Sequence, residues 1–573
     1  MFIQQIEEMK PVNLFLGAGV SKLAPSYAPI WKEMQIGFCE GLFDKMRSER
    51  WDVDDTDQEL EELRRFNFRP ETFWERVLNI TSLEFISSAL SVVNRGKPNL
   101  NHKVIAELCD RGIVNNIITT NFDEYLDTCL PNKYHRIVSQ NECSTAGSKQ
   151  IYFKIHGSIS LSESLQFTLR HTKKIPDGKS ALLERCLQGL PLVFIGYSGW
   201  DDDIMPRLRA IAPQIPKIIV VRYPGSRMDE PINLLSQFPQ TEIIEADFSR
   251  ETKVWADLHE NELGNRFADR FSSSDEATDL KSFYRQILVQ VEVPAIPYLM
   301  SLLFELAASR DLSKKYAWLA DDACDDARYQ DRLSGGLRRR IKVNLSTAVA
   351  PSDTEMSKLF MDQAHENISD NPVSIASGTM NNVDRVFEYF YGGKLTSAQE
   401  AEIEQYATGA LNMLGIGVIH GQGIKFRGSW CMGRLRAYQD RLPEAVQFYT
   451  AALADLPEDL DDVQRASFIL DFGLAALRCS AIDNDNEMLN VAIGLLSEAE
   501  RIAVNINDHM TAAKAMMNLA SCYTLCGEFD LSIKKVKRAQ ELAVLTGDSG
   551  LRERAHNLED SLRKQIQEFK SMM

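Results

Sequence analysis

Short apolar runs alternate with helical stretches between residue 11 and about residue 250. Because the runs are rich in β-branched residues, they are typical of strands covered on both faces of a sheet. They span residues 12–16, 113–118, 151–153, 192–195, 218–221 and 242–244. This alternation predicts an α/β domain with a Rossmann-like, doubly wound parallel sheet. Residues 30–95 are helical in character and too long for a plain crossover, so we expect a helical insertion there.

The pattern changes at a polar stretch, residues 272–276, which we interpret as a linker. Beyond it no apolar run predicts a strand, and the chain is helical with repeated short turns. We therefore predict an α/β domain over residues 1–270, a helical linker or repeat region over 271–430 and helical repeats over 431–573.

The last 150 or so residues are internally similar. Small and large residues recur at helical spacing in three segments: Ala445-x3-Tyr449-x2-Ala452, Ala492-x3-Leu496-x2-Ala499, and Leu519-Ala520-x2-Tyr523 followed by Gly527, Ser532, Val536 and Ala539. This pattern resembles tetratricopeptide repeats, in which small residues lie where two helices cross. Equivalent positions are separated by 47 and then 40 residues (445 to 492 to 532), so the repeats are degenerate. A non-repeating helical bundle is the alternative.

Four polar fragments each follow a predicted strand. They are Gly17-Ala18-Gly19-Val20-Ser21, Thr119-Thr120-Asn121-Phe122-Asp123, His156-Gly157-Ser158 and Gly196-Tyr197-Ser198-Gly199. In an open parallel sheet, ligands bind outside the carboxyl ends of the strands, so the four fragments are expected to line one crevice. A nucleotide-handling enzyme is the leading interpretation.

Each fragment has a chemical interpretation and a structural one. The glycine turn could let a phosphate approach the backbone, or it could be an ordinary tight turn. Asn121 and Asp123 could hold sugar hydroxyls or a water, or they could cap a helix. His156 could act as a general base because its pKa lies near neutrality, or it could be structural.

The acidic run Asp201-Asp202-Asp203 follows the fourth fragment. It could be the start of a capped helix or part of a metal site. No histidine or cysteine lies beside it in the sequence, so we expect no metal there.

As an ordered set, these fragments resemble the sirtuin (silent information regulator) family over roughly residues 1–250. GAGVS is similar to the sirtuin glycine turn, and TTNFDEYL to the TxNxD motif. FKIHGSI resembles the catalytic histidine segment, and LVFIGYSGWD the segment that reads GTS in sirtuins. FNFRPETFWERV and PNLNHKVIAEL resemble family helices, and Trp31 resembles a tryptophan of the divergent bacterial branch.

Two departures point to one branch of that family. Sirtuin deacylases carry two CxxC pairs on a zinc ribbon, whereas only Cys186 lies between Gly157 and Gly196 here. The chain also lacks a GIPDFR-like stretch after GAGVS. Both absences match sirtuin-like domains of bacterial anti-phage systems, which cleave NAD, and no zinc is expected.

The resemblance implies an NAD hydrolase that acts in abortive infection, with residues 1–270 as its NAD-binding catalytic domain. Asn121 and His156 would be the catalytic pair. The NAD contacts would come from the other strand-end residues, namely Gly17, Ala18, Gly19, Ser21, Thr120, Asp123, Gly196, Tyr197 and Ser198. We expect the helical region to gate the activity through a co-encoded or phage-derived protein or a nucleotide trigger, in a homo-oligomer or hetero-complex.

Two alternative functions remain. An NAD-dependent protein deacylase or ADP-ribosyltransferase would use the same fold, but the absence of the zinc ribbon disfavours it. A non-catalytic nucleotide-sensing scaffold would not need both Asn121 and His156.

Composition excludes other classes. The net charge of -17 argues against non-specific nucleic-acid binding, which rests on basic residues meeting phosphates. We find no run of about 18 apolar residues and no signal-peptide pattern, and the ten cysteines are scattered, so we expect a cytoplasmic protein without a membrane partner.

Overall fold

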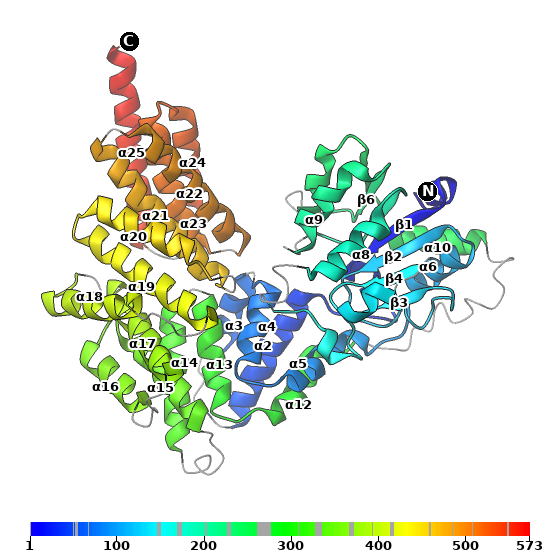
Figure 1. The fold of residues 1–573 in the computed structure, drawn as a ribbon, viewed down its shortest axis with the longest axis horizontal. Helices are drawn as coiled ribbons and strands as arrows, with labels where there is room; N and C mark the ends of the chain where they lie inside the picture. Colours follow the sequence, from blue (N-terminus) through cyan, green and yellow to red (C-terminus); the bar gives the residue numbers. More distant parts are fainter. Residues whose placement is uncertain are drawn as a thin grey trace. The chain divides into compact units, whose positions relative to one another are not determined.

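A computed structural model describes most of the chain. The described residues are 2–49, 51, 56–66, 68–145, 150–168, 175–199, 201, 203–225, 231–259, 277–307, 309–326, 335–365, 372–391, 394–412, 418–457, 460–483, 485–506, 508–546 and 549–572. Their contacts form two compact units (Figure 1). Unit 1 contains Met1–Trp51 and Pro70–Val291, and unit 2 contains Asp52–Arg69 and Glu292–Met573. The domain limits predicted from the sequence stay predictions.

A seven-stranded parallel sheet forms the centre of unit 1, in the order β3-β4-β2-β1-β5-β6-β7. Its strands are β1 Val12–Leu16, β2 Val114–Thr119, β3 His135–Ile137, β4 Ile151–Lys154, β5 Leu192–Ile195, β6 Ile218–Arg222 and β7 Thr241–Glu245. The predicted doubly wound sheet is confirmed. Sequence analysis missed β3, a three-residue edge strand that contains His135 and Arg136 and therefore has no apolar run.

Helices cover both faces of the sheet because successive residues of a buried strand point to opposite sides. Leu14 packs with the cluster that contains α6 (Leu100–Asp110) and α10 (Phe248–Leu258). Its neighbour Phe15 packs with the cluster that contains α8 (Asp177–Leu187) and α9 (Ile204–Ile211). The sheet is thereby packed between two apolar layers, which fix the positions of its strand ends.

The parts of the predicted helical insertion that belong to unit 1 form helices beside the sheet domain. They contain α2 (Trp31–Ser48), α4 (Pro70–Leu78) and α5 (Leu83–Leu90), and α12 (Leu280–Ile287) packs against them from beyond the predicted linker. Glycines on α2 permit the close approach of α12, since a Cβ at Gly37 would lie 2.5 Å from the Cβ of Leu280. Buried aromatic rings, those of Phe38, Phe73, Trp74 and Tyr284, fill the space between these helices.

Unit 2 is helical throughout its described residues, which confirms the predicted all-α superhelix. Its helices are α3 Thr56–Arg65, α13 Ala295–Leu306, α14 Arg310–Asp325, α15 Gly335–Val349, α16 Thr354–His365, α17 Pro372–Phe387, α18 Ser397–Leu411, α19 Val418–Tyr438, α20 Leu442–Ala454, α21 Asp462–Asp483, α22 Asn486–Asn505, α23 His509–Leu525, α24 Phe529–Leu545 and α25 Ser549–Met572. Among the helices described, none is long and apolar enough to span a bilayer.

The repeat positions behave as the sequence pattern predicts. Tyr449 is buried, and a Cβ placed on Gly433 would lie 3.0 Å from its ring. Leu496 is buried in the same way against Gly473, where a Cβ would lie 2.8 Å from the Leu496 side chain. Small residues on one helix therefore accommodate large residues on the next, which supports the resemblance to tetratricopeptide repeats.

Helix α3 belongs to unit 2 although the chain on either side of its segment belongs to unit 1. Glu59 on α3 is 5% exposed. Its carboxylate accepts hydrogen bonds from the Tyr316 hydroxyl and, at 2.6 Å, from Lys315 Nζ. The buried carboxylate therefore fastens α3 to α14.

We expect Glu59→Ala to lower the free energy of unfolding of the helical unit by about 3 kcal/mol, because it leaves the buried Tyr316 hydroxyl without its acceptor. Denaturant unfolding followed by circular dichroism measures this. Glu61→Ala on the same helix is the control, since Glu61 is exposed and forms a surface ion pair with Arg64. Equal unfolding free energies in the two variants would contradict the prediction.

Candidate functional site

The four polar fragments follow four strands that are neighbours in the sheet. Leu16 at the end of β1 pairs with Thr119 of β2 and with Ile195 of β5. Thr119 in turn pairs with Lys154 of β4. The four strands therefore end at one level, and the segments that follow them meet at one edge of the sheet, as predicted.

Asn121 and His156 occupy equivalent positions at this edge. Each lies two residues beyond a member of the Thr119–Lys154 pair. Ile155 N–H donates to the Thr119 carbonyl at 3.0 Å, which is one of the two hydrogen bonds of that pair. Because neighbouring strands lie about 4.8 Å apart, Asn121 and His156 follow two strand ends that are adjacent at the edge.

The glycine turn packs directly against the end of β5. A Cβ at Gly17 would lie 2.3 Å from the Gly196 carbonyl oxygen, and one at Gly19 would lie 2.8 Å from the Gly196 Cα. Gly19 N–H donates to the Gly196 carbonyl at 3.1 Å, and Gly196 has a φ of 66°. Contact between the two backbones thus accounts for these glycines, while Ala18 and Gly19 remain exposed at the strand ends.

The sheet topology changes direction at this contact. From β1 the chain continues to β2 on one side, whereas from β5 it continues to β6 on the other. Ligands of doubly wound sheets bind where neighbouring strands diverge in this way. The Gly17–Gly196 contact lies at that switch point.

The amide of Asn121 is held in one orientation. Its Nδ2 donates to the Gly17 carbonyl at 3.1 Å, and its backbone N–H donates to Thr119 Oγ1 at 3.1 Å. Since Nδ2 is engaged, Oδ1 is the atom that can accept a hydrogen bond from a ligand hydroxyl or a water. Thr120 is half-buried beside it, and its N–H donates to the Leu16 carbonyl at 3.4 Å.

A buried chain of hydrogen bonds lies behind the edge. Asn99 N–H donates to Nδ1 of His102 at 3.1 Å, so the His102 proton is on Nε2. That Nε2–H donates to Ser21 Oγ at 3.0 Å, and the Ser21 hydroxyl donates to Asp123 Oδ2 at 2.9 Å. In a nucleophilic triad the histidine instead accepts the serine proton, so this arrangement does not activate Ser21.

Ser21 and Asp123 were predicted to contact a cofactor. The structure buries both side chains and bonds them to each other. Burial raises the pKa of Asp123, with Lys154 and the Ser21 hydrogen bond opposing that rise. The pair fixes the turn after β1 to the turn after β2, and a direct ligand contact stays a prediction.

Burial lowers the pKa of His102 to about 3, so we expect acid to destabilise the domain. As the pH falls below about 6.5, the unfolded chain binds a proton at this position and the folded chain does not, which costs about 1.4 kcal/mol per pH unit. Unfolding measured between pH 5 and 6.5 should therefore be less pH-dependent in His102→Gln than in the wild type. Parallel pH dependences would contradict this.

His156 is buried between acidic groups. Its Nε2 lies 3.2 Å from Asp203 Oδ2, and its Nδ1 lies 3.9 Å from Asp201 Oδ1. Burial lowers the pKa of His156, but the carboxylates of Asp203 and Asp201 outweigh burial and raise it to about 9, against opposition from Lys179. The histidine is thus an imidazolium at neutral pH.

Lys179 of α8 supports the backbone beside His156. Its Nζ donates to the Ile155 carbonyl at 2.5 Å, and the residue is 1% exposed. Burial lowers its pKa to about 8. A hydrogen bond from a buried amine therefore holds the backbone beside His156.

A histidine that is distant in the sequence lies beside the acidic run. The fold brings His156 from the end of β4 to Asp201 and Asp203. Ligand atoms of these three residues lie within 4.8 Å of one another and could hold a cation. A protonated His156 supplies a positive charge to the same carboxylates, as a cation would. The expectation that no metal binds here therefore stays a prediction.

The fourth fragment contributes mainly its backbone to the edge. Tyr197 is buried, with its ring centroid 4.7 Å from that of Phe15 and 6.1 Å from that of Phe194. Ser198 is half-buried, and its carbonyl accepts the Ile232 N–H at 3.1 Å. Gly196 is exposed. The predicted contacts of Tyr197 and Ser198 with a nucleotide stay predictions.

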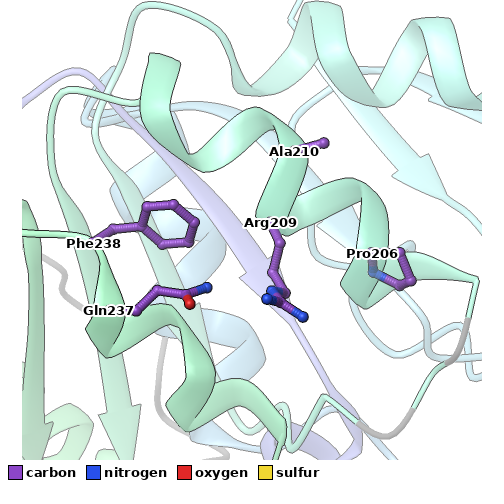
Figure 2. A pocket seen from close by; sticks show the side chains of 5 residues that line it. All are labelled: Pro206, Arg209, Ala210, Gln237 and Phe238. Carbon is purple, nitrogen blue, oxygen red and sulfur yellow. The ribbon is translucent and has the colours of Figure 1, made fainter. Parts of the chain in front are cut away.

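A hollow of about 630 Å³ lies elsewhere in unit 1, on α9 and the 3₁₀ helix η6 (Pro231–Gln237) (Figure 2). It is lined by Pro206, Arg209, Ala210, Gln237 and Phe238. None of these is a predicted site residue, so this hollow is separate from the strand ends.

Comparison with known proteins finds a family model that matches part of unit 1. Residues 115–236 match the family model described as a SIR2-like domain. The curated proteins give no match. A solved structure similar to this chain is the signal transduction ATPase with numerous domains (STAND) protein with a tetratricopeptide repeat sensor from Pyrococcus horikoshii. It has a TM-score of 0.32 and 9% identity, and the similarity covers 99% of this chain and 96% of that one. The matched segment contains Asn121, His156, Gly196 and Asp203, and this part of unit 1 is therefore similar to a SIR2-like domain.

Proposed function

We propose that this protein hydrolyses NAD to ADP-ribose and nicotinamide. The observation that supports the proposal is that Asn121 and His156 each follow, by two residues, the paired ends of adjacent strands β2 and β4, within the segment similar to a SIR2-like domain. An amide and an imidazole at one edge can act on one ribose. NAD is the substrate here and leaves as two products.

Cleavage of the nicotinamide–ribose bond develops positive charge on the ribose, so catalysis rests on positioning and electrostatics. In the proposed mechanism Asn121 Oδ1 orients the ribose hydroxyl or the attacking water. His156 takes a proton from that hydroxyl or water, once it has released its own second proton. The positive nicotinamide ring favours this release, because a like charge lowers the pKa of an imidazolium.

The remaining contacts are proposed from their places at the edge. The backbone from Gly17 to Ser21 would lie along the pyrophosphate, where Ala18 and Gly19 are exposed. Thr120 and Asp123 would support the ribose site, and Gly196, Tyr197 and Ser198 would contact the second nucleotide.

We further propose that the activity serves cytoplasmic anti-phage defence by abortive infection and that the helical unit gates it. Free NAD hydrolysis would kill the cell that makes the enzyme. Repeat superhelices present long surfaces to protein partners, and a phage-derived or co-encoded trigger would bind there, in a homo-oligomer or hetero-complex. Full activity of the purified single chain without any trigger would contradict gating.

The second candidate is a protein deacylase or ADP-ribosyltransferase. Its zinc ribbon would require cysteine pairs after His156, whereas Cys186 is a buried residue of α8. This observation favours hydrolysis over transfer to a protein.

Product analysis tests the proposal. NAD is measured in cells that express the full chain, with and without phage infection, and extracts are resolved by chromatography. We expect infection to convert NAD to equal amounts of ADP-ribose and nicotinamide. O-acyl-ADP-ribose or labelled protein would establish the transferase instead, and unchanged NAD under infection and in purified protein would support the non-catalytic scaffold.

A further inference from the structure

Asp203 lies directly before α9 but its side chain does not cap the helix. Its backbone is already helical, with φ −78° and ψ −32°, and Met205 N–H donates to the Asp201 carbonyl at 3.1 Å. Asp247, before α10, has the extended backbone of a capping residue and does bond Ser249 N–H and Arg250 N–H. The Asp203 carboxylate is therefore used for something else.

That carboxylate points at His156. The Asp203 side chain is 0% exposed, and its Oδ2 lies 3.2 Å from His156 Nε2. Its other oxygen, Oδ1, has no hydrogen-bond partner among the described residues. A buried carboxylate with one unsatisfied oxygen is costly, so the contact with His156 is the interaction that offsets its burial.

The contact decides which nitrogen of His156 is engaged by a carboxylate at hydrogen-bond distance. With the Nε2 proton held by Asp203, Nδ1 is the nitrogen left for proton exchange. Asp201 lies 3.9 Å from Nδ1, which is beyond hydrogen-bond distance, so Asp201 attracts the proton without holding it.

We infer that Asp203 is a positioning residue, which holds the Nε2–H of His156 and leaves Nδ1 as the nitrogen that exchanges a proton during NAD cleavage. The inference rests on the proposed function for its effect on turnover. The geometry of the aspartate–histidine pair does not depend on that function. Asp203 itself acts through His156 and does not contact the substrate.

Three charged groups face His156 from the elements packed around it. Asp203 and Asp201 precede α9, and Lys179 lies on α8. Loss of the Asp203 charge removes the main counter-ion of the His156 imidazolium. The charges that remain, on Asp201 and Lys179, have opposite effects on the pKa of His156. The rise of turnover with pH, which reports the deprotonation of His156 to its base form, should then move to lower pH.

The test compares Asp203→Asn and Asp203→Ser with the wild-type full chain. For Asp203→Asn we expect kcat to fall about 100-fold or more with KM within about three-fold, and the pH profile to move down by about one unit or more. Asp203→Ser leaves the buried His156 without this partner and should be less stable than the wild type, so kcat is compared at a temperature at which both variants remain folded. A purely structural role would instead make activity loss follow loss of stability.

A second measurement does not need catalysis. The His156 ring, followed by nitrogen-15 NMR in protein without NAD, should show the Nε2–H form when neutral and should titrate at lower pH in Asp203→Asn. An unchanged titration would overturn the inference whatever the activity. A shifted titration in a protein that cleaves no NAD would refute the proposed function alone.

A cation bound by the same residues would also overturn the inference. The wild type is assayed after chelation and with added Mg²⁺, Mn²⁺ or Zn²⁺. Activity that is unchanged by chelation supports a proton on His156. Activity that disappears and returns with one of these ions would make Asp203 a metal ligand instead.

Discussion

Alanine at Asn121 or at His156 is expected to lower NAD turnover at least about 1,000-fold, below ordinary detection. Each variant removes one of the two side chains proposed to act on the ribose, and assistance by a general base alone contributes about 10²–10⁴-fold. The measurement is NAD loss with product analysis, in infected cells and with purified protein. His259→Ala is the matched control, because His259 is half-buried at the end of α10 and lies away from the strand ends.

The same two variants separate chemistry from folding. Asn121 is half-buried and donates one side-chain hydrogen bond, to the Gly17 carbonyl, so its loss should cost only about 1 kcal/mol of stability. His156 forms a buried ion pair with Asp203, so His156→Ala should be less stable, and His156→Gln is the milder replacement. Near-normal turnover in either folded variant would remove that residue from the mechanism.

The sheet and the location of the site follow from the sequence because both depend on short-range patterns. The apolar runs predict β1, β2, β4, β5, β6 and β7, and each polar fragment was found where its strand ends. β3 could not be predicted, since its three residues gain their place by pairing with β4 and not by their own hydrophobicity.

The electrostatics of the site depend on long-range contacts and could not be predicted. His156 and Asp203 are 47 residues apart in the sequence. They come together only in the folded sheet, in which β4 and β5 flank β2 and β1. The sequence therefore suggested a neutral base, whereas the fold encloses His156 among carboxylates. The hydroxyl of Ser21 likewise looked available for a phosphate, and the fold engages it with His102 and Asp123.

Tyr197 shows the same difficulty at a single residue. A tyrosine after a strand end suggests a ligand contact, but its side chain faces the apolar layer beside Phe15. Alternation along an extended segment places neighbouring residues on opposite sides. The direction of the Tyr197 side chain could have been predicted only if the exact end of β5 had been known.

Gly17→Ala is expected to have the second largest effect, because it tests what the glycine turn is for. The added Cβ would lie 2.3 Å from the Gly196 carbonyl oxygen and 2.7 Å from the Tyr197 Cα. Both neighbours are backbone atoms, so the ends of β1 and β5 must move apart. We expect about 3 kcal/mol of destabilisation and a loss of turnover, since the Gly17 carbonyl that orients Asn121 moves as well.

Gly178→Ala is the matched control for that variant. Gly178 lies in α8 of the same unit, and a Cβ there would meet nothing closer than Gln140 Cγ at 3.4 Å, an ordinary contact. Alanine is favoured over glycine in a helix by up to about 1 kcal/mol, so this variant should be as stable as the wild type or more stable. If Gly17→Ala unfolded like Gly178→Ala but bound NAD more weakly, the turn would serve the pyrophosphate rather than the sheet. Destabilisation with the loss of both binding and turnover would instead establish that the contact between the two strand ends builds the site.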